Sequence, residues 1–527
     1  MIRTNTIRSL KTLHTLKPVN KTRLGLRFNS KATNESVPKS TYRVNDDSLF
    51  PEDAADATST VIADAFDFQN RIQNKDRVTW WEILEKQELR LKEGKSIDSL
   101  TIDDVKTTKV SEKTRADSFS YLPLKFKDDL SLRDFYINAP GRLRFGHLFQ
   151  DLDALAGRVA ARHCKPAEPM NVTASIDRIY VSRKIDEINK YNFLIAGFVT
   201  YTGNSSMEIC IKGFAYETDL PSEITPKLIE TDADKCFLSA DFTFVARNPA
   251  THKSHKINKI LPTTEREWID FKRAESHNAA KKLRAKTSSL DKVPPTESES
   301  KMIHSLYNSS KALFELPKSQ RPTNVSLMRH TKLTATQIQQ PQYRNRHGII
   351  FGGYLLRQTF ELAYCAAGAF SRSFPRFISL DNTTFKAPVP VGSVLQMDAE
   401  VCYTEHIHET DDDAPSAQVL KSVLPDYDSS SNVLNDHQEL LSVPGTLIQV
   451  KVDTKVCDLN EPTKYTETGT FVYSFYVPRD VECFDSPGYS SVIPQSYAEM
   501  INYVEGKRRA KDTAAYAQQL MMSSGDL

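Results

Sequence analysis

An internal duplication constrains the fold of this chain more than any other feature of its sequence. Residues 138–146 (NAPGRLRFG) recur 207 positions later as residues 345–353 (NRHGIIFGG), with Asn first and Gly last in both. Further along, Ser-Ile-Asp at 175–177 recurs 204 positions later as Ser-Leu-Asp at 379–381. Landmarks that repeat in the same order at a nearly constant spacing predict two copies of one structural unit.

Each copy continues with a helix and then with strands. Apolar residues recur at spacings of three and four between Leu148 and Val159, which predicts a helix over about 147–163. The second helix, about 353–370, is apolar on nearly every side, so we expect it to be enclosed. The strand-like runs lie at 192–202, 206–215 and 237–246, and in the second copy at 394–403, 446–452 and 470–477. This order predicts an α+β fold in which an antiparallel sheet wraps around a central helix.

Length and composition agree with a folded two-domain protein. The 527 residues suit two domains with tails, and 39% hydrophobic with 26% charged residues is typical of globular chains. A net charge of +2 gives no reason to expect nucleic acid as a partner. The longest apolar stretch, 191–202, is well short of the roughly 20 residues that span a bilayer, so we expect no transmembrane segment.

The cysteine pattern and the motif search bear on cofactors. Seven cysteines are scattered without a C-x-x-C pair, which favours reduced thiols and no structural zinc. The chain also has no cluster with metal-ligand spacing and no credible dinucleotide fingerprint. We therefore expect no metal or redox cofactor.

The first 34 residues have a composition of their own. They carry eight Lys and Arg side chains, many Ser and Thr, and no acidic residue before Glu35. This composition predicts a mitochondrial transit peptide, with the matrix as the destination. A disordered basic tail is the alternative, and the complete exclusion of acids favours the targeting reading.

Several segments resemble the hotdog acyl-coenzyme A thioesterases, in particular their mitochondrial tandem-hotdog branch. The resemblance rests on residues 141–157 (GRLRFGHLFQDLDALAG), on 345–363 and on 492–499 (VIPQSYAE), and it covers about 115–510. It implies two hotdog domains in tandem, with hydrolysis of acyl-CoA at a composite site between them. Coenzyme A is then part of the substrate and not a cofactor.

The expected organisation follows from the duplication and from this resemblance. The segments are a transit peptide (1–34), an N-terminal extension (35–115), hotdog domain 1 (116–255), a charged helical linker (256–325), hotdog domain 2 (326–480) with an exposed loop insertion (406–444), and a C-terminal tail (481–527). A helix is expected at about 80–95 within the extension. A tandem pair supplies both halves of a hotdog dimer in one chain, so a monomer and a homo-oligomer are both compatible with the sequence.

The resemblance also implies site residues. Related thioesterases use an Asn eight residues before the helix-opening Gly and an acid seven residues after it, taken from different domains. Asn138 and Asn345 fill the two Asn positions, and Asp153 fills the acidic position of the first copy. The second copy departs from the pattern, with Phe360 at that position and Glu361 one residue later. The resemblance thus favours one complete site, Asp153 with Asn345, over a second pairing of Asn138 with Glu361.

Thioester hydrolysis needs an activated water or a nucleophile, and donors for the developing oxyanion. Helix starts at Gly146 and at Gly352-Gly353 would expose unpaired backbone N–H groups and a positive dipole end. Asp153 could act as general base or attack directly, and the sequence does not separate these roles. Asn345 could orient water or the thioester. By resemblance, Ser175 could support the water from a neighbouring strand.

Each of these residues also has a structural interpretation. Asp153 could be a solvated helix carboxylate, the two Asn could be turn residues that bond their own backbone, and the glycines could allow close helix packing. For Glu361 we prefer an intrahelical pair with Arg357. The basic run at 507–511 (KRRAK) could meet coenzyme A phosphates, or it could be a solvated face.

Two other functions compete with hydrolysis. A hotdog dehydratase or hydratase could use His347 with Glu361 as an acid–base pair, although the motifs typical of those enzymes are missing. A catalytically silent acyl-CoA-binding or assembly protein could have kept the fold, and Phe360 in the acidic position favours that reading. The preferred acyl chain length depends on the depth of the folded cavity and is not predicted.

Overall fold

The computed structural model describes residues 105–287, 290, 293–345, 348–408, 441–479 and 489–525. Four expectations from the sequence fall outside these residues. They are the transit peptide, the helix at about 80–95, most of the insertion 406–444, and any role of His347.

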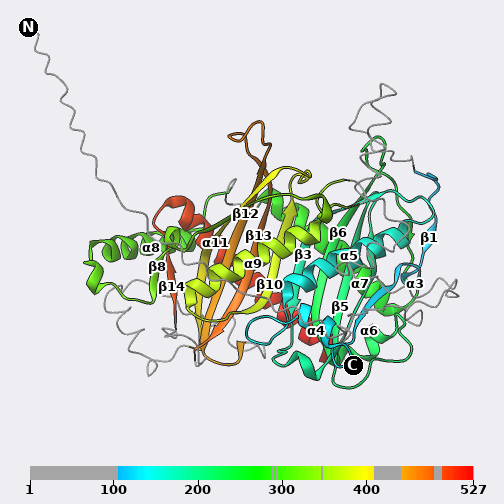
Figure 1. The fold of residues 1–527 in the computed structure, drawn as a ribbon, viewed down its shortest axis with the longest axis horizontal. Coiled ribbons are helices and arrows are strands. Elements are labelled where there is room, and N and C mark those ends of the chain that lie inside the picture. Colours follow the sequence, from blue (N-terminus) through cyan, green and yellow to red (C-terminus); the bar gives the residue numbers. More distant parts are fainter. Residues whose placement is uncertain are drawn as a thin grey trace, which may run out of the picture. The chain divides into compact units, whose positions relative to one another are not determined.

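A single ten-stranded antiparallel sheet forms the framework (Figure 1). Its first half is β2 (Ser120–Leu124), β4 (Asn192–Thr202), β5 (Ser206–Tyr216), β6 (Cys236–Arg247) and β3 (Met170–Val181), in that spatial order. The second half is β10 (Arg376–Phe385), β13 (Thr466–Pro478), β12 (Gly445–Cys457), β11 (Val394–Ile407) and β9 (Leu333–Ile338). Each half is one copy of the sequence repeat.

The two halves join where β3 pairs with β10. These strands occupy equivalent places in the two copies, and the register matches Tyr180 with Ser379 and Ser175 with Thr384. At the repeat spacing of 204, Ser175 corresponds to Ser379 and Tyr180 to Thr384, so each of these pairs is the counterpart of the other and the junction has an approximate twofold symmetry. Sites built at the junction should therefore occur in pairs.

The central helices of the two copies lie side by side on one face of this sheet (Figure 1). They are α5 (Phe145–Cys164) and α9 (Gly352–Ser371), and their apolar sides are buried in one continuous core. Glycine allows the close contact, because a Cβ at Gly353 would lie 2.9 Å from the backbone oxygen of Gln150. The predicted α+β hotdog fold, with sheet wrapped around a central helix, is confirmed in both copies.

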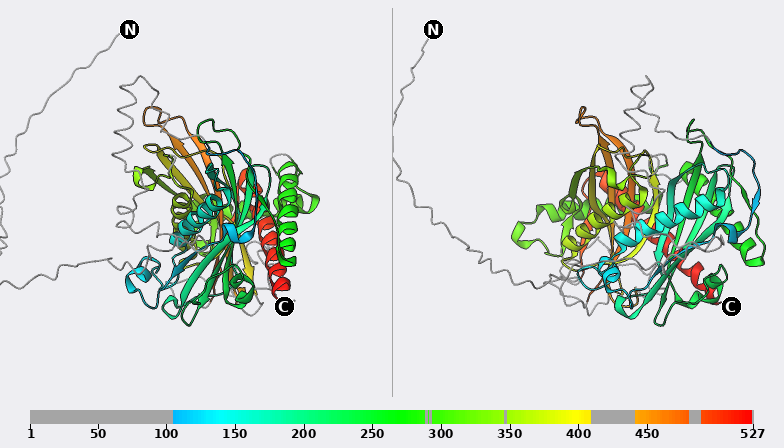
Figure 2. Two further views of the ribbon diagram at one scale, coloured as in Figure 1. Left: turned by 90° about the vertical axis from the view of Figure 1, so that its right-hand side faces the viewer. Right: turned by 45° about the vertical axis from the view of Figure 1, so that its right-hand side comes forward.

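Two further helices cover the opposite face of the sheet (Figure 2). α7 (Glu265–Thr287) lies against the first half, and α11 (Tyr497–Gly525) lies along the second half and the junction. The region between the copies also contains α8 (Glu297–Glu315). Short helices and strands elsewhere in the chain are α3 (Arg115–Ser118), α4 (Leu130–Phe135), α6 (Leu228–Thr231), β1 (Glu112–Lys113), β7 (Lys259–Ile260), β8 (Val325–Leu327) and β14 (Ser491–Ile493).

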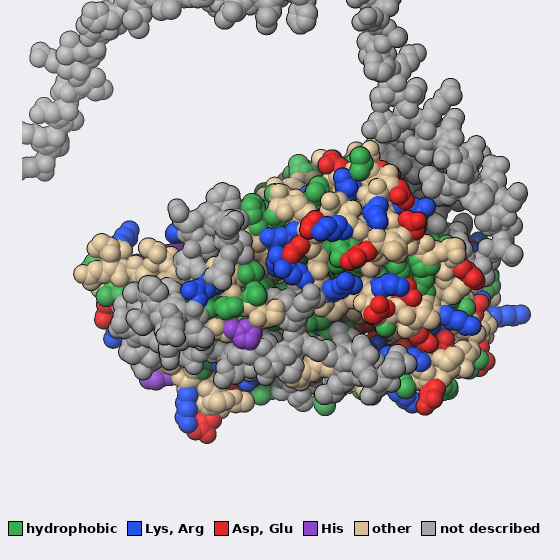
Figure 3. Space-filling model, turned by 90° about the horizontal axis from the view of Figure 1, so that it is seen from below, with side chains coloured by type: hydrophobic (Ala, Val, Ile, Leu, Met, Phe, Trp, Pro, Cys, Tyr) green, Lys and Arg blue, Asp and Glu red, His purple; other side chains and the backbone are tan. Residues whose placement is uncertain are grey.

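The main difference from the sequence analysis lies at the C-terminus. The segment expected to be a tail contains α11, a helix of 29 residues. Its pattern is weak because it is partly buried on several sides, against β11, β10 and α8. Basic and acidic side chains are interspersed over the visible surface (Figure 3), in line with the small net charge.

Candidate active site

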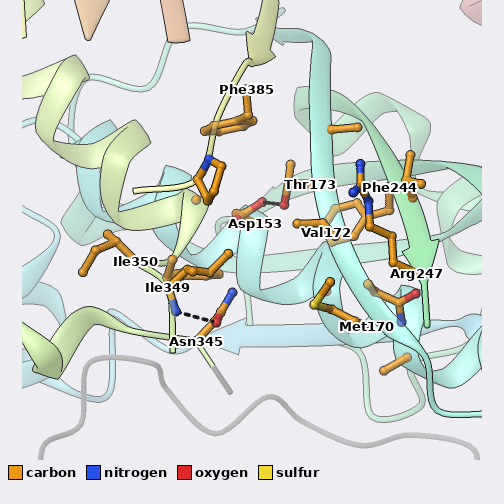
Figure 4. A pocket seen from close by; sticks show the side chains of 18 of the residues that line it. Asp153, Met170, Val172, Thr173, Phe244, Arg247, Asn345, Ile349, Ile350 and Phe385 are labelled. Carbon is orange, nitrogen blue, oxygen red and sulfur yellow. Dashed lines mark hydrogen bonds between the residues drawn. The ribbon is translucent and has the colours of Figure 1, made fainter. Parts of the chain in front are cut away.

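A cleft of about 920 Å³ lies between α5 of the first half and the start of α9 of the second half. We call it the first cleft. It is lined by Asp153 of α5, Thr173 of β3 and Asn345 from a loop of the second copy (Figure 4). Gly352, at the start of α9, also lines it. The structure thus places Asp153 and Asn345, which are far apart in the sequence, in one cavity.

Asp153 is the buried acid of this cleft. Only 1% of its surface is exposed, although carboxylates are rarely buried without a partner. Its Oδ1 accepts a hydrogen bond of 2.8 Å from the Thr173 hydroxyl, whereas Oδ2 has no partner with normal hydrogen-bond geometry. Burial raises the pKa of Asp153 to about 6, while Thr173 and the nearby Gly353 N–H oppose the rise. A carboxylate with such a pKa is suited to take up a proton near neutral pH.

The start of α9 faces this carboxylate. A Cβ added to Gly352 would lie 3.1 Å from Oδ2 of Asp153, so glycine is what keeps the space between them open. The first N–H groups of an α-helix have no acceptor within the helix, and the dipole makes this end positive. The arrangement therefore puts a proton acceptor and oxyanion donors on opposite sides of a narrow gap.

Asn345 lies at the mouth of the same cleft, in a tight turn. Its backbone N–H donates to Ile349 O at 2.7 Å, and its Oδ1 accepts from Ile349 N at 3.4 Å. Asn138 makes the same two bonds with Arg142, at 2.8 and 2.7 Å. Both Asn residues therefore bond to the backbone of their own turn, as the structural interpretation expected. They differ in their surroundings, because only the cleft of Asn345 contains Asp153.

Ser175 does not line the first cleft. Its hydroxyl donates to Asp177 and accepts from Lys281 of α7, on the face of the sheet that α7 covers. The reason is a β-bulge between Thr173 and Ser175, which reverses the side to which the following residues point. Thr173 is the residue that contacts Asp153, and the sequence analysis missed it. The bulge leaves no signal in the sequence that would have distinguished the two.

A second cleft, of about 360 Å³, occupies the symmetry-related place between α9 and the loop before α5. It contains Asn138, the counterpart of Asn345. The other key positions differ: Phe360 stands for Asp153, Phe377 for Thr173 and Phe145 for Gly352. The ring of Phe377 contacts the other two, with its centroid 5.1 Å from that of Phe145 and 5.6 Å from that of Phe360. The second cleft therefore lacks the buried acid, its hydroxyl partner and the open helix start.

Glu361 contributes no free carboxylate to this second cleft. Its Oε1 accepts a hydrogen bond of 2.8 Å from Arg144 of the other copy, so the ion pair crosses between the halves. The expected intrahelical pair with Arg357 is not the contact that forms, because α5 approaches α9 closely enough for Arg144 to reach Glu361. Gly146 permits that approach, since a Cβ there would lie 2.7 Å from Oε1 of Glu361. Gly146 is thus a helix-contact residue.

The basic run at 507–511 lies in α11 and lines neither cleft. Arg508 forms a two-bond ion pair with Glu299 of α8, at 2.6 and 2.7 Å. Arg509 pairs with Glu505 and reaches Gln449 of β12. Arg508 and Arg509 thus hold α11 against its neighbours, whereas Lys511 is exposed.

Among the described residues, one group has the composition of a metal site. Asp177, Glu208 and His277 offer ligand atoms within 4.8 Å of one another beneath α7. The Lys281 ammonium forms an ion pair with Asp177, so α7 contacts the sheet at this group through an ionic pair. None of the three residues lines the first cleft.

The six cysteines in the described part of the chain are free, and no helix in it is long and apolar enough to cross a membrane.

Comparison with known proteins gives consistent relatives. No family model matches the chain. Acyl-coenzyme A thioesterase 2, chloroplastic, from Humulus lupulus is 33% identical over 328 residues, which are 61% of this chain and 72% of that protein. Acyl-coenzyme A thioesterase 9, mitochondrial, from Mus musculus is 28% identical over 402 residues, 75% of this chain and 77% of the relative.

Among solved structures, an acyl-CoA hydrolase from Staphylococcus aureus is 20% identical, covers 33% of this chain and 90% of its own, and has a TM-score of 0.26. The sequence relatives are sufficient to assign the chain to a family, because it covers 72% of the Humulus lupulus thioesterase at 33% identity. The chain belongs to the acyl-coenzyme A thioesterase family.

Proposed function

We propose that the first cleft is where this acyl-CoA thioesterase hydrolyses its substrates to free fatty acid and coenzyme A. The observation that carries the proposal is the buried Asp153 carboxylate, whose pKa is raised to about 6 and whose Oδ2 faces the start of α9. Burying such a group destabilises the fold, so its retention is best explained by function.

The residues suggest a sequence of proton movements. Asp153 accepts a proton from a water molecule as the water oxygen bonds to the thioester carbonyl carbon. Backbone N–H groups at Gly352 and Gly353 stabilise the oxyanion, and Asn345 orients the water or the thioester. The C–S bond then breaks, and the sulfur of coenzyme A takes the proton back from Asp153. The products are a carboxylic acid and a thiol, and Asp153 is restored.

Direct attack by Asp153 on the carbonyl carbon is the other route, through a mixed anhydride that water then hydrolyses. A single turnover in ¹⁸O-labelled water tests the second route. Label found in the Asp153 carboxylate would show direct attack, with water adding to the Asp153 carbonyl of the anhydride. Label found only in the fatty acid would exclude that path and leave the general-base route or attack of water on the acyl carbonyl of the anhydride.

We propose that the chain has one hydrolytic site. Phe360 provides no proton acceptor in the second cleft, and Glu361 is held by Arg144. That ion pair also weakens the dehydratase alternative, which needed Glu361 as an acid or base. The reaction proposed here uses only water and residues of the chain, so activity should survive treatment with EDTA.

Matched variants test the site. Thiol release from acyl-CoA should fall by at least about 100-fold in Asp153→Asn, since the base is lost. Glu168→Gln removes another carboxylate that lines the cleft, exposed and paired with Lys106, and should keep nearly full activity. Full activity in Asp153→Asn would rule out the proposed site.

The two asparagines form a second matched pair, because both make the same turn. Asn345→Ala and Asn138→Ala should cost similar stability, and only Asn345→Ala should lose activity. Equal losses of activity in the two variants would mean that Asn345 acts only by stabilising its turn.

We further propose that the two copies act as an intramolecular hotdog pair, because the first cleft needs residues from both. A chain that already contains both halves can be active as a monomer, and light scattering on the active protein would show whether it also assembles.

We also propose a mitochondrial location, with import into the matrix. The acid-free basic segment 1–34 and the mitochondrial relatives support this. Fractionation of mitochondria tests it.

A further inference from the structure

The second cleft has kept the outline of a substrate site after losing the groups for hydrolysis. Its turn at Asn138 makes the same hydrogen bonds as the turn at Asn345, and Gly141 and Gly348 have almost equal φ values of +80° and +79°. The helix start and the facing helix also correspond to those of the first cleft. Its volume of about 360 Å³ lies in the ordinary range for ligand pockets.

The floor of this cleft is apolar. It is formed by aromatic and aliphatic side chains from both copies, namely Leu143, Phe145, Val181, Ile185, Phe360 and Phe377. Such a surface would accept a hydrocarbon chain, and it has no carboxylate at the position where Asp153 lies in the first cleft.

The rim of this cleft, in contrast to its floor, is strongly basic. Four arginines line the cleft against a single acid, Glu361. Arg144 pairs with Glu361, and Arg376 pairs with Asp186 at the edge. In the described part of the chain, Arg183 makes no hydrogen bond or ion pair and is only partly exposed. The rim therefore has unneutralised positive charge next to an apolar floor.

The state of His147 agrees with a positive local field. This residue lies behind the rim and contacts Arg144, with 3.1 Å between Nη1 and Nε2. Burial, together with the charges of Arg357 and Arg144, lowers the pKa of His147 to about 3. His147 thus stays neutral at pH 7 and adds no further charge beside the rim.

We propose that the second cleft binds acyl-CoA without hydrolysing it. The apolar floor receives the acyl chain, and the arginines of the rim, Arg183 above all, receive the phosphates. Among anionic lipids, acyl-CoA is favoured because the cleft is the symmetry-related copy of the site for that molecule. This inference rests on the first cleft being the hydrolytic site. It adds a second binding site whose occupant remains intact.

A thioether analogue tests the proposal, because S-octyl-CoA cannot be hydrolysed. Calorimetric titration of the full chain should give two equivalents bound. Arg183→Glu should weaken one of the two sites by at least about tenfold, while the initial hydrolysis rate at low acyl-CoA stays unchanged. Lys190→Glu makes the same charge change at an exposed residue outside the cleft and should leave both sites intact.

A second variant protects the test against misfolding. Ala139 is an exposed residue of the cleft, and Ala139→Trp should fill it and remove the same equivalent. If the unaltered chain binds only one equivalent of S-octyl-CoA, the proposal is wrong. It is also wrong if Arg183→Glu and Ala139→Trp both still bind two equivalents at full affinity. Octanoate and coenzyme A are tested separately. Octanoate binding as tight as that of S-octyl-CoA, lost in Arg183→Glu, would show that the cleft takes the fatty acid product and not acyl-CoA.

Failure of the proposed function has a different signature. If hydrolysis persists in Asp153→Asn and is lost in Glu361→Gln, the second cleft is the hydrolytic one and both proposals fall. If Asp153→Asn is inactive and S-octyl-CoA binds with one equivalent, only the second binding site is excluded.

Discussion

The buried carboxylate of Asp153 should make the active protein less stable than an inactive variant. Ionising this group inside the cleft is unfavourable, as the rise of its pKa from 3.8 to about 6 shows. Each tenfold change in proton affinity is worth about 1.4 kcal/mol, so the charged Asp153 costs about 3 kcal/mol of folding free energy at neutral pH. Asp153→Asn removes that charge and keeps an oxygen for the Thr173 hydroxyl.

The sign of this effect depends on pH. Below pH 3.8 the carboxyl is protonated in both the folded and the unfolded chain, so it costs nothing. Between about pH 4 and 6 the unfolded chain releases its proton while the folded chain keeps it, and the cost grows. Above about pH 6 the cost is complete. Asp153→Asn should therefore unfold at a higher temperature than the unaltered chain at pH 8, by about 3 °C for a chain of this size.

Thermal unfolding of both proteins at pH 8 and near pH 4 is the required measurement. We expect a stabilised variant at pH 8, almost no difference in stability near pH 4, and thiol release by the variant at pH 8 that is lower by at least about 100-fold. Equal stability of the two proteins at pH 8 would show that Asp153 is not buried as a strained carboxylate. The explanation for its pKa would then be wrong.

Three further predictions concern the surroundings of Asp153 and one distant ion pair. Thr173→Val removes a hydroxyl that lowers the pKa of Asp153, so the acidic limb of the pH–rate profile should move above about pH 6; a limb that moves down would contradict the assigned hydrogen bond. Gly352→Ala places a Cβ 3.1 Å from Oδ2 of Asp153 and should lower kcat by roughly tenfold or more, with less effect on KM, as steady-state kinetics would show. Arg508→Ala breaks the pair with Glu299 and should cost about 1 kcal/mol or less, because both groups are partly exposed. Since the pair lowers the pKa of Glu299 from 4.5 to about 2, that loss should be present at pH 7 and should disappear in denaturation curves as the pH falls toward 2.

Much of the framework could be predicted from the sequence because it depends on local patterns. The apolar repeat between Leu148 and Val159 predicts the helix that the structure has as α5, and the strand runs correspond to β4, β5, β6, β11, β12 and β13. The duplication put Asn138 and Asn345 at equivalent positions of the two copies. The resemblance then directed attention to Asp153 and Asn345, which the structure places in one cleft.

The sequence analysis did not anticipate α11 as a helix, because its pattern is spread over several partly buried sides. Its contacts with the sheet and with α8 come from segments far away in the chain. Likewise, Glu361 was expected to pair within its own helix, and only the close approach of α5 brought Arg144 to it.

What the sequence by itself determined is the repeat and the alternation of helix and strands, because these follow from patterns along the chain, whereas Asp153 was singled out only by the family resemblance. What only the tertiary structure decided is which side chains meet. A bulge in β3 put Thr173 in place of Ser175 beside Asp153, and the pairing of β3 with β10 brought Phe145, Phe360 and Phe377 together in the second cleft. Strand register and helix approach are set by the whole core, so no local pattern could specify these contacts.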